Sequence, residues 1–219
     1  MLRTSKPAES GLHDTFNRTK ALLPGLRALL FDLDGTLVDT MELHFLAYRQ
    51  VLSDLGGVFN RSNFEEIVGP PAEITVPRFV RAAGLDPARM PPAAEIHARK
   101  KRAFAAIIAR QPLRTLPASD LLRELCEVFA IAVVTSGNRN GAEAILGAAG
   151  LAGAVTVLVT GDDVKQGKPA PYPYLLALNS LECRADEAMA FEDHDDGILS
   201  ATRAGLVVID VRTSELVTP

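Results

Sequence analysis

The segment "FDLDGTLVDT", residues Phe31–Thr40, is the most informative part of this sequence about its architecture. Three apolar residues, Leu29–Phe31, lead directly into Asp32, and a second acid, Asp34, follows two positions later. A short, continuous apolar run predicts a strand buried on both faces of a parallel sheet. Because buried like charges are costly, a folded domain tolerates acids at the end of such a strand only if a cation lies nearby or the acids have a chemical role.

The composition limits the kind of protein that this chain forms. Its 219 residues suit one moderately large domain or a core with a smaller inserted domain. The net charge of −4 argues against a nucleic-acid-binding surface. The N-terminus is polar, without a secretion signal, and no apolar run would span a bilayer, so we expect a cytoplasmic protein with no membrane partner. Cys126 and Cys183 predict reduced, buried thiols.

The spacing of apolar residues changes along the chain. Residues 42–111 predict helices only, one of them interrupted by Pro77. Between residues 113 and 212 strands alternate with helices, which indicates a parallel sheet with helices on both faces. One of these helices is expected to begin at Ser119 or Asp120, and "LVVIDV" is the last strand expected.

These patterns predict an α/β protein with a Rossmann-like parallel sheet core and an inserted, all-helical cap domain. A polar N-terminal extension precedes the first strand, with a flexible start and a short helix that begins near Asp14 and ends at Pro24. The predicted boundaries are 1–24 for the extension, 25–41 and 112–219 for the core, and 42–111 for the cap.

Polar residues follow four of the predicted strands, at the edge where an open parallel sheet binds its ligands. The first strand leads to Asp32 and Asp34, and the third leads to a loop that carries Lys168. The other strand-end groups are Thr135, Ser136, Gly137 and Asn138 after the second strand, Asp162 and Asp163 after the third, and Glu192, Asp193, Asp195 and Asp196 after the fourth.

Four segments, "FDLDGTLVD", "VVTSGN", "GKPAP" and "FEDHDDG", occur in this order and resemble the four motifs of the haloacid dehalogenase superfamily. The place of the helical block and the "FEDxxxG" form resemble its β-phosphoglucomutase-like and phosphoglycolate-phosphatase-like subfamily. The resemblance covers about residues 27–212. It implies a Mg2+-dependent phosphatase that hydrolyses small phosphate monoesters, of the phosphosugar or phosphoglycolate type, through an aspartyl-phosphate intermediate.

The chemistry of the two leading acids agrees with this resemblance. Asp32 is the candidate nucleophile that forms the aspartyl-phosphate. Residues two apart in a strand share a face, so Asp34 reaches the same site and is the candidate general acid and base. Gly35 allows a sharp turn after these acids. Dehalogenases attack carbon and lack the second acid, so Asp34 argues against that activity.

Oxygen ligands of the Mg2+ ion and donors to the phosphoryl group complete the expected site. Mg2+ prefers hard oxygen ligands, and those expected are the side chains of Asp32 and Asp193, the backbone carbonyl of Asp34 and Glu192, directly or through water. Lys168 adds positive charge beside Asp32, and Ser136 holds a phosphoryl oxygen, helped by the backbone N–H groups of Gly137 or Asn138.

Two cap residues are candidates for contact with the substrate. By resemblance to β-phosphoglucomutase, Lys100 in the basic run "RKKR" is a cap lysine that faces the substrate, and His44 is a cap-hinge histidine within reach of Asp34. The alternative for Lys100 is a solvated basic face of a helix, and the alternative for His44 is a histidine that only packs or lies at the surface. Likewise, Asp195 and Asp196 are read as caps of the following helix, and Asp162, Asp163 and Asp39 as structural acids.

Three positions depart from the family pattern. Ala72, in "GPPAE", stands where a mutase has an Arg that binds a second phosphate. The presence of this alanine argues against mutase activity. Tyr172 replaces an Asp and His194 replaces a Ser, both without an assigned role. A phosphosugar mutase and a non-catalytic phosphometabolite-binding protein remain as alternatives. The sequence specifies neither the physiological substrate nor the oligomeric state, and it is compatible with a monomer.

Overall fold

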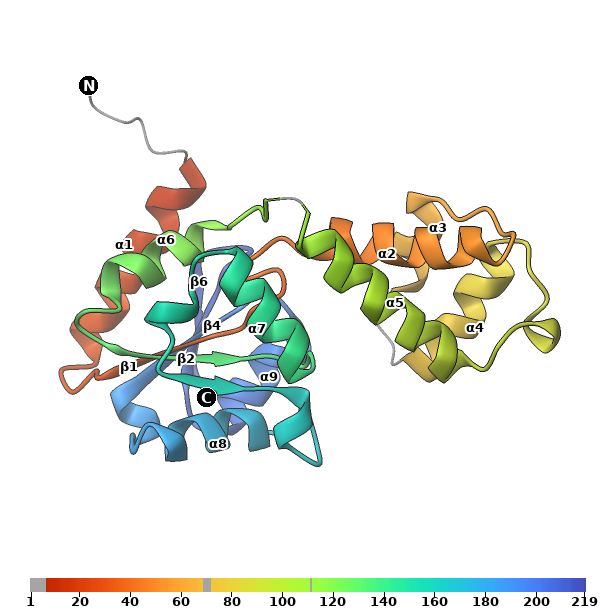
Figure 1. The fold of residues 1–219 in the computed structure, drawn as a ribbon. Coiled ribbons are helices and arrows are strands. Elements are labelled where there is room, and N and C mark those ends of the chain that lie inside the picture. The colour runs from red at the N-terminus through yellow and green to blue at the C-terminus, as the bar shows by residue number, and fades with distance from the viewer. Residues whose placement is uncertain (1–6, 69–71, 111) are drawn as a thin grey trace, which may run out of the picture. The chain divides into compact units, whose positions relative to one another are not determined.

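The computed structural model describes residues 7–68, 72–110 and 112–219 (Figure 1). The chain divides into two compact units. Met1–Asp39 and Leu113–Pro219 form one of them, here called the core unit, and Thr40–Pro112 form the other, here called the helical unit. The candidate catalytic and metal-binding residues from the sequence all belong to the core unit, whereas His44 and Lys100 belong to the helical unit.

A six-stranded sheet with the strand order β3-β2-β1-β4-β5-β6 organises the core unit. The first five strands of this order run parallel, and β6 is antiparallel to β5. The strands are β1 (Ala28–Phe31), β2 (Ala130–Val134), β3 (Val157–Val159), β4 (Ala188–Glu192), β5 (Val207–Asp210) and β6 (Glu215–Val217). All four residues of the central strand β1 are buried, as its apolar run predicts.

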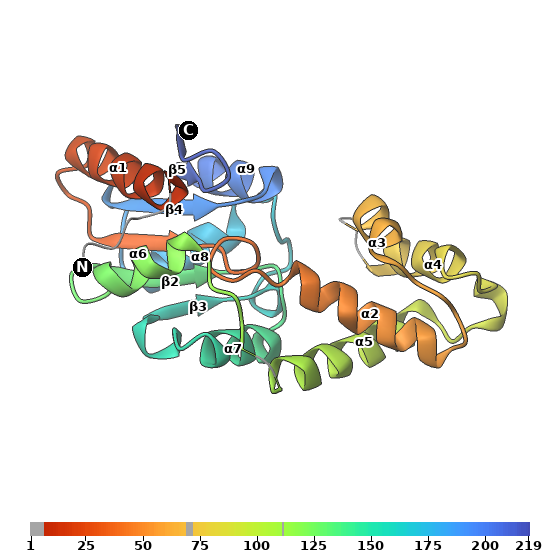
Figure 2. The ribbon, with the colours of Figure 1, turned by 90° about the horizontal axis from the view of Figure 1, so that it is seen from above.

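Helices cover both faces of this sheet (Figure 2). Leu30, Val134 and Ala190 face a cluster that includes Tyr174 and Ala201 of the helices α8 and α9. The opposite face packs against α1 and α6. The bounds of the core-unit helices are α1 (Pro7–Leu22), α6 (Pro117–Leu125), α7 (Arg139–Ala148), α8 (Tyr172–Ser180) and α9 (Asp195–Arg203), with short 3-10 turns η2 (Ala152–Ala154), η3 (Gly161–Asp163) and η4 (Ala185–Glu187). The predicted α/β class is therefore confirmed.

The first helix is longer than predicted, because it begins at Pro7 and not near Asp14. Its residues Leu12 and Phe16 are buried, and the ring of Phe16 lies 6.2 Å from that of Phe129 and 6.4 Å from that of Phe191. Packing of an apolar helix face against the rest of the protein stabilises additional helical turns, so a helix can begin before the N-cap residue predicted from the sequence. The helix therefore has a structural role, covering the sheet.

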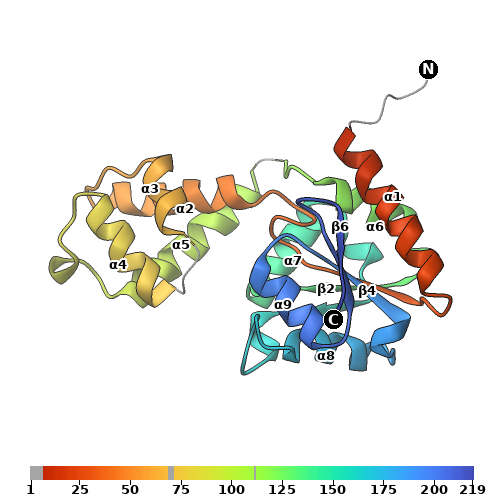
Figure 3. The ribbon, with the colours of Figure 1, turned by 180° about the vertical axis from the view of Figure 1, so that it is seen from behind.

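Two further predictions in the core unit were wrong. A sixth strand, β6, follows the expected last strand, and the C-terminus lies on the same side of this unit as α9 (Figure 3). The helix α6 begins at Pro117, so neither Ser119 nor Asp120 is its cap. Ser119 is instead fully buried and donates a hydrogen bond to the carbonyl of Leu37.

The helical unit consists of α2 (Met41–Asp54), α3 (Arg61–Ile67), α4 (Ala72–Ala82) and α5 (Ala93–Ile108), with the turn η1 (Pro87–Arg89). Its core is aromatic, since the rings of Phe59 and Tyr48 lie 4.9 Å and 4.8 Å from that of Phe79. The helix α4 continues through Pro77, contrary to the predicted interruption. Val76 and Phe79 on either side of this proline are buried, and their packing outweighs its helix-breaking effect.

The described residues contain no helix with the length and apolar character needed to cross a bilayer.

Candidate active site

Asp32 follows β1 at the carboxyl edge of the sheet. The parallel register pairs Phe31 with Val133 of β2 and with Phe191 of β4, so Asp32 emerges between the ends of both neighbouring strands. Its backbone N–H donates to the carbonyl of Phe191 over 3.0 Å, which continues the ladder by one residue. The residue is only 7% exposed, so its carboxylate lies in a largely desolvated position.

Lys168 directs its ammonium group onto this carboxylate. Its Nζ lies 2.7 Å from Asp32 Oδ1, 2.6 Å from Glu192 Oε1 and 2.8 Å from the carbonyl oxygen of Val134. A lysine ammonium has three N–H donors, and these three acceptors use all of them. The position of Lys168 against Asp32 is therefore specified by the two strands β2 and β4.

Glu192, the last residue of β4, is 1% exposed and accepts two hydrogen bonds on the same oxygen. The donors to its Oε1 are Lys168 and the hydroxyl of Tyr174, each over 2.6 Å. No role for Tyr174 was predicted from the sequence, because a tyrosine in an apolar helix is interpreted as a packing residue. Only the path of α8 along the sheet brings its hydroxyl to this acid.

The surroundings raise the pKa of both Asp32 and Lys168, but for different reasons. Burial raises the pKa of Asp32 well above its ordinary value, against the effect of Lys168, and the nearby acids Glu192, Asp193 and Asp34 add to the increase. Burial by itself lowers the pKa of Lys168, but Asp32 and Glu192 outweigh burial and raise it. The lysine thus stays charged, while the acids of this cluster repel one another and favour a further cation.

Three acids meet the requirements of a cation site. One oxygen each of Asp32, Glu192 and Asp193 lies within 4.8 Å of the others. Among the described residues, Asp32 Oδ2 is the one buried side-chain nitrogen or oxygen without a hydrogen-bond partner. Burial also raises the pKa of Asp193, followed in effect by the charge of Glu192. This cluster fits Mg2+, because the ion prefers hard carboxylate oxygens as ligands. A bound cation would also relieve the repulsion between the acids and provide a partner for Asp32 Oδ2.

The turn after β1 brings Asp34 and Asp193 into the same region. Gly35 has a φ of +91°, and a Cβ at this position would overlap the carboxylate of Asp193. A residue with a side chain therefore does not fit here. Thr36 donates to Asp193 Oδ1 over 3.4 Å, and Thr135 donates to Asp34 Oδ2 over 3.3 Å. Thr36 was not predicted as a site residue, and Thr135 was expected only as one of the polar strand-end groups.

The loop after β2 carries the predicted phosphoryl-binding residues. Thr135 accepts a hydrogen bond from the backbone N–H of Gly137 over 3.0 Å, which shapes the loop. Ser136 is exposed, and the N-cap of α7 is Asn138, whose side chain accepts from the N–H of Gly141. Ser136 is therefore not the cap of this helix, and its hydroxyl lies at the surface of the core unit.

The remaining acids of the strand ends have structural contacts. Asp163 accepts from Thr160 and pairs with Arg139 at 2.8 Å, in agreement with the structural reading of this acid. Asp162 accepts from the backbone N–H of Arg139, and Asp39 pairs with Arg114 at 3.1 Å.

An acid, Asp195 or Asp196, was predicted to cap α9, but the N-cap of this helix is His194. The Nδ1 atom of His194 accepts from the backbone N–H of Asp196 over 3.3 Å, while Asp195 and Asp196 lie in the first turn. The role of His194, open in the sequence, is thus that of a helix cap. Asp195 and Asp196 still stabilise α9, because negative charges in the first turn of a helix interact favourably with the helix dipole.

His44 and Lys100 form a pair inside the helical unit. Lys100 is 7% exposed, and its Nζ lies 2.6 Å from Nδ1 of His44. The ammonium also lies 4.8 Å from the ring centroid of Phe104 and 5.3 Å from that of Tyr48. Lys100 is therefore not part of a solvated basic face, unlike its exposed neighbour Lys101.

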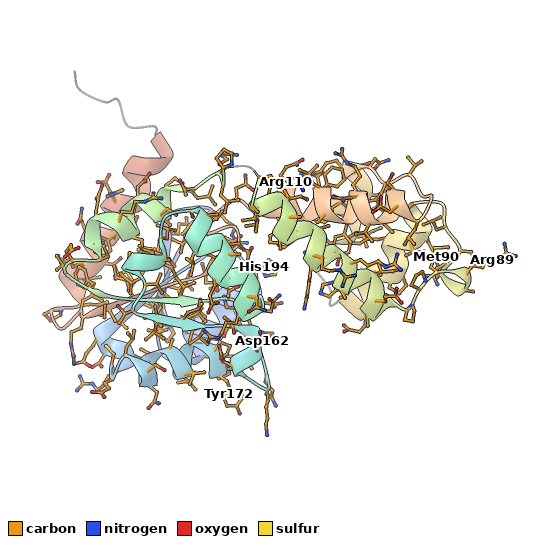
Figure 4. All side chains as sticks on the ribbon, in the orientation of Figure 1. Arg89, Met90, Arg110, Asp162, Tyr172 and His194 are labelled. Carbon is orange, nitrogen blue, oxygen red and sulfur yellow. The ribbon has the colours of Figure 1, made fainter. Side chains whose placement is uncertain are left out.

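Of the "GPPAE" element, residues 69–71 lie outside the described residues, and Ala72 is the first residue of α4. Tyr172 is 52% exposed on α8 and points outward from the core unit (Figure 4). The aspartate expected by resemblance at this position is thus replaced by a surface residue.

Comparison with known proteins agrees with the fold. The model of the haloacid dehalogenase-like hydrolase family matches residues 29–211, and the chain belongs to this family. The predicted resemblance is thereby confirmed.

Several of the named relatives are phosphatases of small phosphorylated compounds. The chain is 31% identical to the fructose-1-phosphate phosphatase YqaB of Escherichia coli, over 84% of this chain and 95% of that one. It is 30% identical to the phosphorylated carbohydrates phosphatase of Thermotoga maritima, over 83% and 82%. Crystal structures of CbbY from Rhodobacter sphaeroides, in complex with phosphate and with xylulose-(1,5)bisphosphate, are 33% identical with a TM-score of 0.73, covering 84% of this chain and 85% of theirs.

Proposed function

We propose that this protein is a Mg2+-dependent phosphatase of small phosphate monoesters, with Asp32 as the nucleophile. The observation that carries the proposal is the state of the Asp32 carboxylate, whose Oδ1 is held by Lys168 while the buried Oδ2 has no partner among the described residues. A buried carboxylate in this state has one oxygen fixed and the other available to a ligand. The names of the relatives support a sugar phosphate as the substrate class.

The proposed reaction has two steps. A carboxylate oxygen of Asp32 attacks phosphorus, the bond from phosphorus to the ester oxygen breaks, and Asp34 gives its proton to the leaving alcohol. Asp34 then takes a proton from a water molecule, which attacks phosphorus and breaks the bond to Asp32, so that phosphate is released.

Lys168 and the loop after β2 would hold the transferring phosphoryl group. The charge of Lys168 lies beside Asp32 and compensates negative charge on the phosphoryl oxygens. The hydroxyl of Ser136 and the N–H group of Asn138 are donors in the same loop, whereas the N–H group of Gly137 donates to Thr135. Mg2+, held by Asp32, Asp193 and the carbonyl of Asp34 with help from Glu192, would neutralise the acidic cluster and the phosphate.

The helical unit is the proposed cap that selects the leaving group. Lys100 places a positive charge beside the buried rings of Tyr48 and Phe104, and this charge is proposed to attract the hydroxylated or carboxylated body of a small organic phosphate. Closure of a cap over a substrate excludes water and completes the site. We expect phosphosugars, or phosphoglycolate, to be preferred over unfunctionalised esters.

A panel of phosphate esters tests this proposal, with phosphate release measured in the presence of Mg2+ and after its removal by EDTA. The expected result is metal-dependent release from one or more sugar phosphates, lost by at least 1,000-fold (about 4 kcal/mol) in Asp32→Asn. Full activity of Asp32→Asn would refute the mechanism. Interconversion of hexose 1- and 6-phosphates in reactions primed with a bisphosphate would instead identify a mutase, and ligand binding without turnover would identify a binding protein.

A further inference from the structure

Tyr174 contacts two residues of the candidate site although it lies in the hydrophobic core. Its side chain is 0% exposed and belongs to the cluster formed by α8, α9 and the sheet. Its hydroxyl donates to Glu192 Oε1 over 2.6 Å, and the ammonium of Lys168 lies 5.3 Å from its ring centroid. The same side chain therefore touches both the acid and the lysine that pairs with Asp32.

The hydroxyl of Tyr174 is not explained by packing. A phenylalanine would fill the same space between α8 and the sheet, without a polar atom that has to be paired in an apolar core. A hydrogen bond to a carboxylate is, in addition, among the stronger hydrogen bonds in proteins. This hydroxyl is thus placed to act on Glu192 and not only to fill the core.

The effect of the hydroxyl reaches Asp32 through Lys168. Glu192 Oε1 accepts from Tyr174 and from Lys168, so the rotation of this carboxylate determines where Lys168 finds one of its three acceptors. Lys168 in turn holds Asp32 Oδ1. Because both bonds to Glu192 go to Oε1, its second oxygen is the one left for a cation.

We infer that Tyr174 is a positioning residue, whose hydroxyl fixes the Glu192 carboxylate so that Lys168 is held against Asp32 and the acidic cluster keeps its metal-binding arrangement. The inference rests on the proposed function for its effect on turnover, but not for its effect on metal binding. It predicts that loss of this one hydroxyl weakens a site that the tyrosine itself does not enter.

The experiment compares Tyr174→Phe with Tyr172→Phe in the full-length protein. Both variants remove one hydroxyl from the same helix, but that of Tyr172 lies on an exposed side chain. Calorimetric titration with Mg2+ is expected to give a dissociation constant about tenfold higher for Tyr174→Phe, as expected from the loss of a hydrogen bond to a charged group. Tyr172→Phe is expected to match the wild type.

Turnover gives a second readout. For Tyr174→Phe we expect kcat to fall about tenfold with KM within twofold of wild type, because the variant alters the reacting groups and not the substrate contacts. A wild type without turnover, combined with weaker Mg2+ binding by Tyr174→Phe, would refute the proposed function alone. Normal turnover and normal Mg2+ binding by Tyr174→Phe would refute the positioning role alone.

A double-variant cycle separates positioning from a general effect on the fold. In a Glu192→Gln background, Tyr174→Phe should change Mg2+ affinity by less than twofold, since its hydroxyl acts through Glu192. Equal losses in both backgrounds would overturn the inference. So would a Tyr174→Phe protein that melts earlier but binds Mg2+ normally, one that no longer folds by circular dichroism, or a wild type that binds no Mg2+.

Discussion

Gly197 of α9 lies directly against the carboxylate of Glu192, and a Cβ at this glycine would overlap the carboxylate atoms. Glu192 has no room to move aside, because its Oε1 is held by Lys168 and Tyr174 in a fully buried position. The glycine of the "FEDxxxG" segment is thus required by close approach, and not by its backbone conformation. This contact connects the start of α9 with the acid that anchors Lys168.

Gly197→Ala is therefore expected to destabilise the protein by about 1–3 kcal/mol, as overpacking of a filled core does, and to lower turnover at least tenfold. Chemical denaturation and phosphate release measure the two effects. Gly147→Ala is the matched control, because a Cβ at Gly147 in α7 meets no atom within 4 Å. That variant should keep full activity and gain stability, since alanine is the better helix former. Equal behaviour of the two variants would contradict the proposed contact.

Mg2+ should raise the thermal stability of the wild type. A ligand that binds only the folded state at 100 times its dissociation constant adds about 2.7 kcal/mol to the free energy of unfolding. Asp193→Asn removes one of the three clustered oxygens and should abolish most of this effect. Asp196→Asn, which alters an exposed acid in the first turn of α9, should keep it. An unchanged Mg2+ response in Asp193→Asn would place the metal elsewhere.

Stability at acidic pH should depend on Asp210. Hydrogen bonds from the Arg212 side chain lower the pKa of this 7% exposed acid below its ordinary value. A carboxyl group with a lowered pKa in the folded state stabilises the fold above its unfolded pKa of about 3.9, and this contribution is lost as pH falls through the folded pKa.

Asp210→Asn should accordingly lose about 1 kcal/mol at pH 7, a figure reduced because Arg212 is partly exposed, and the difference from wild type should shrink below pH 4. Urea denaturation from pH 7 to pH 3 measures this. Asp186→Asn, at an exposed pair with Arg184, should show no measurable difference at any pH. A difference for Asp210→Asn that does not depend on pH would exclude the ionic contribution.

Lys100 and Lys101 offer a test of the helical unit. Lys100→Met should raise KM for the substrate about tenfold with kcat changed less than threefold, because the positive charge held between Phe104 and Tyr48 is proposed to bind the substrate body. Lys101→Met alters an exposed neighbour on the same helix and should leave KM unchanged. Equal KM values for both variants would remove Lys100 from the proposed substrate contacts.

Much of the core unit was predictable, because it depends on local patterns. The apolar run before Asp32 identified the buried central strand, and the rule that parallel strands present their carboxyl ends at one edge indicated that Lys168 and Glu192 would approach it. The structure brings these three side chains together at 2.6–2.7 Å. Local patterns failed where packing between distant segments decides, as in the start of α1 at Pro7 and in the strand β6.

The residues with suitable chemistry, and the order in which the strands present them, can be read from the amino-acid sequence, since apolar periodicity and residue type are local properties. The pairing of individual oxygens, the glycine that must lack a side chain and the core residue that reaches the site depend on how distant segments pack. The hydroxyl of Tyr174 on Glu192 and the contact of Gly197 with the same carboxylate arise from helices α8 and α9 packing onto one sheet. Contacts of this kind leave no periodic signal, because they depend on distances across the folded chain.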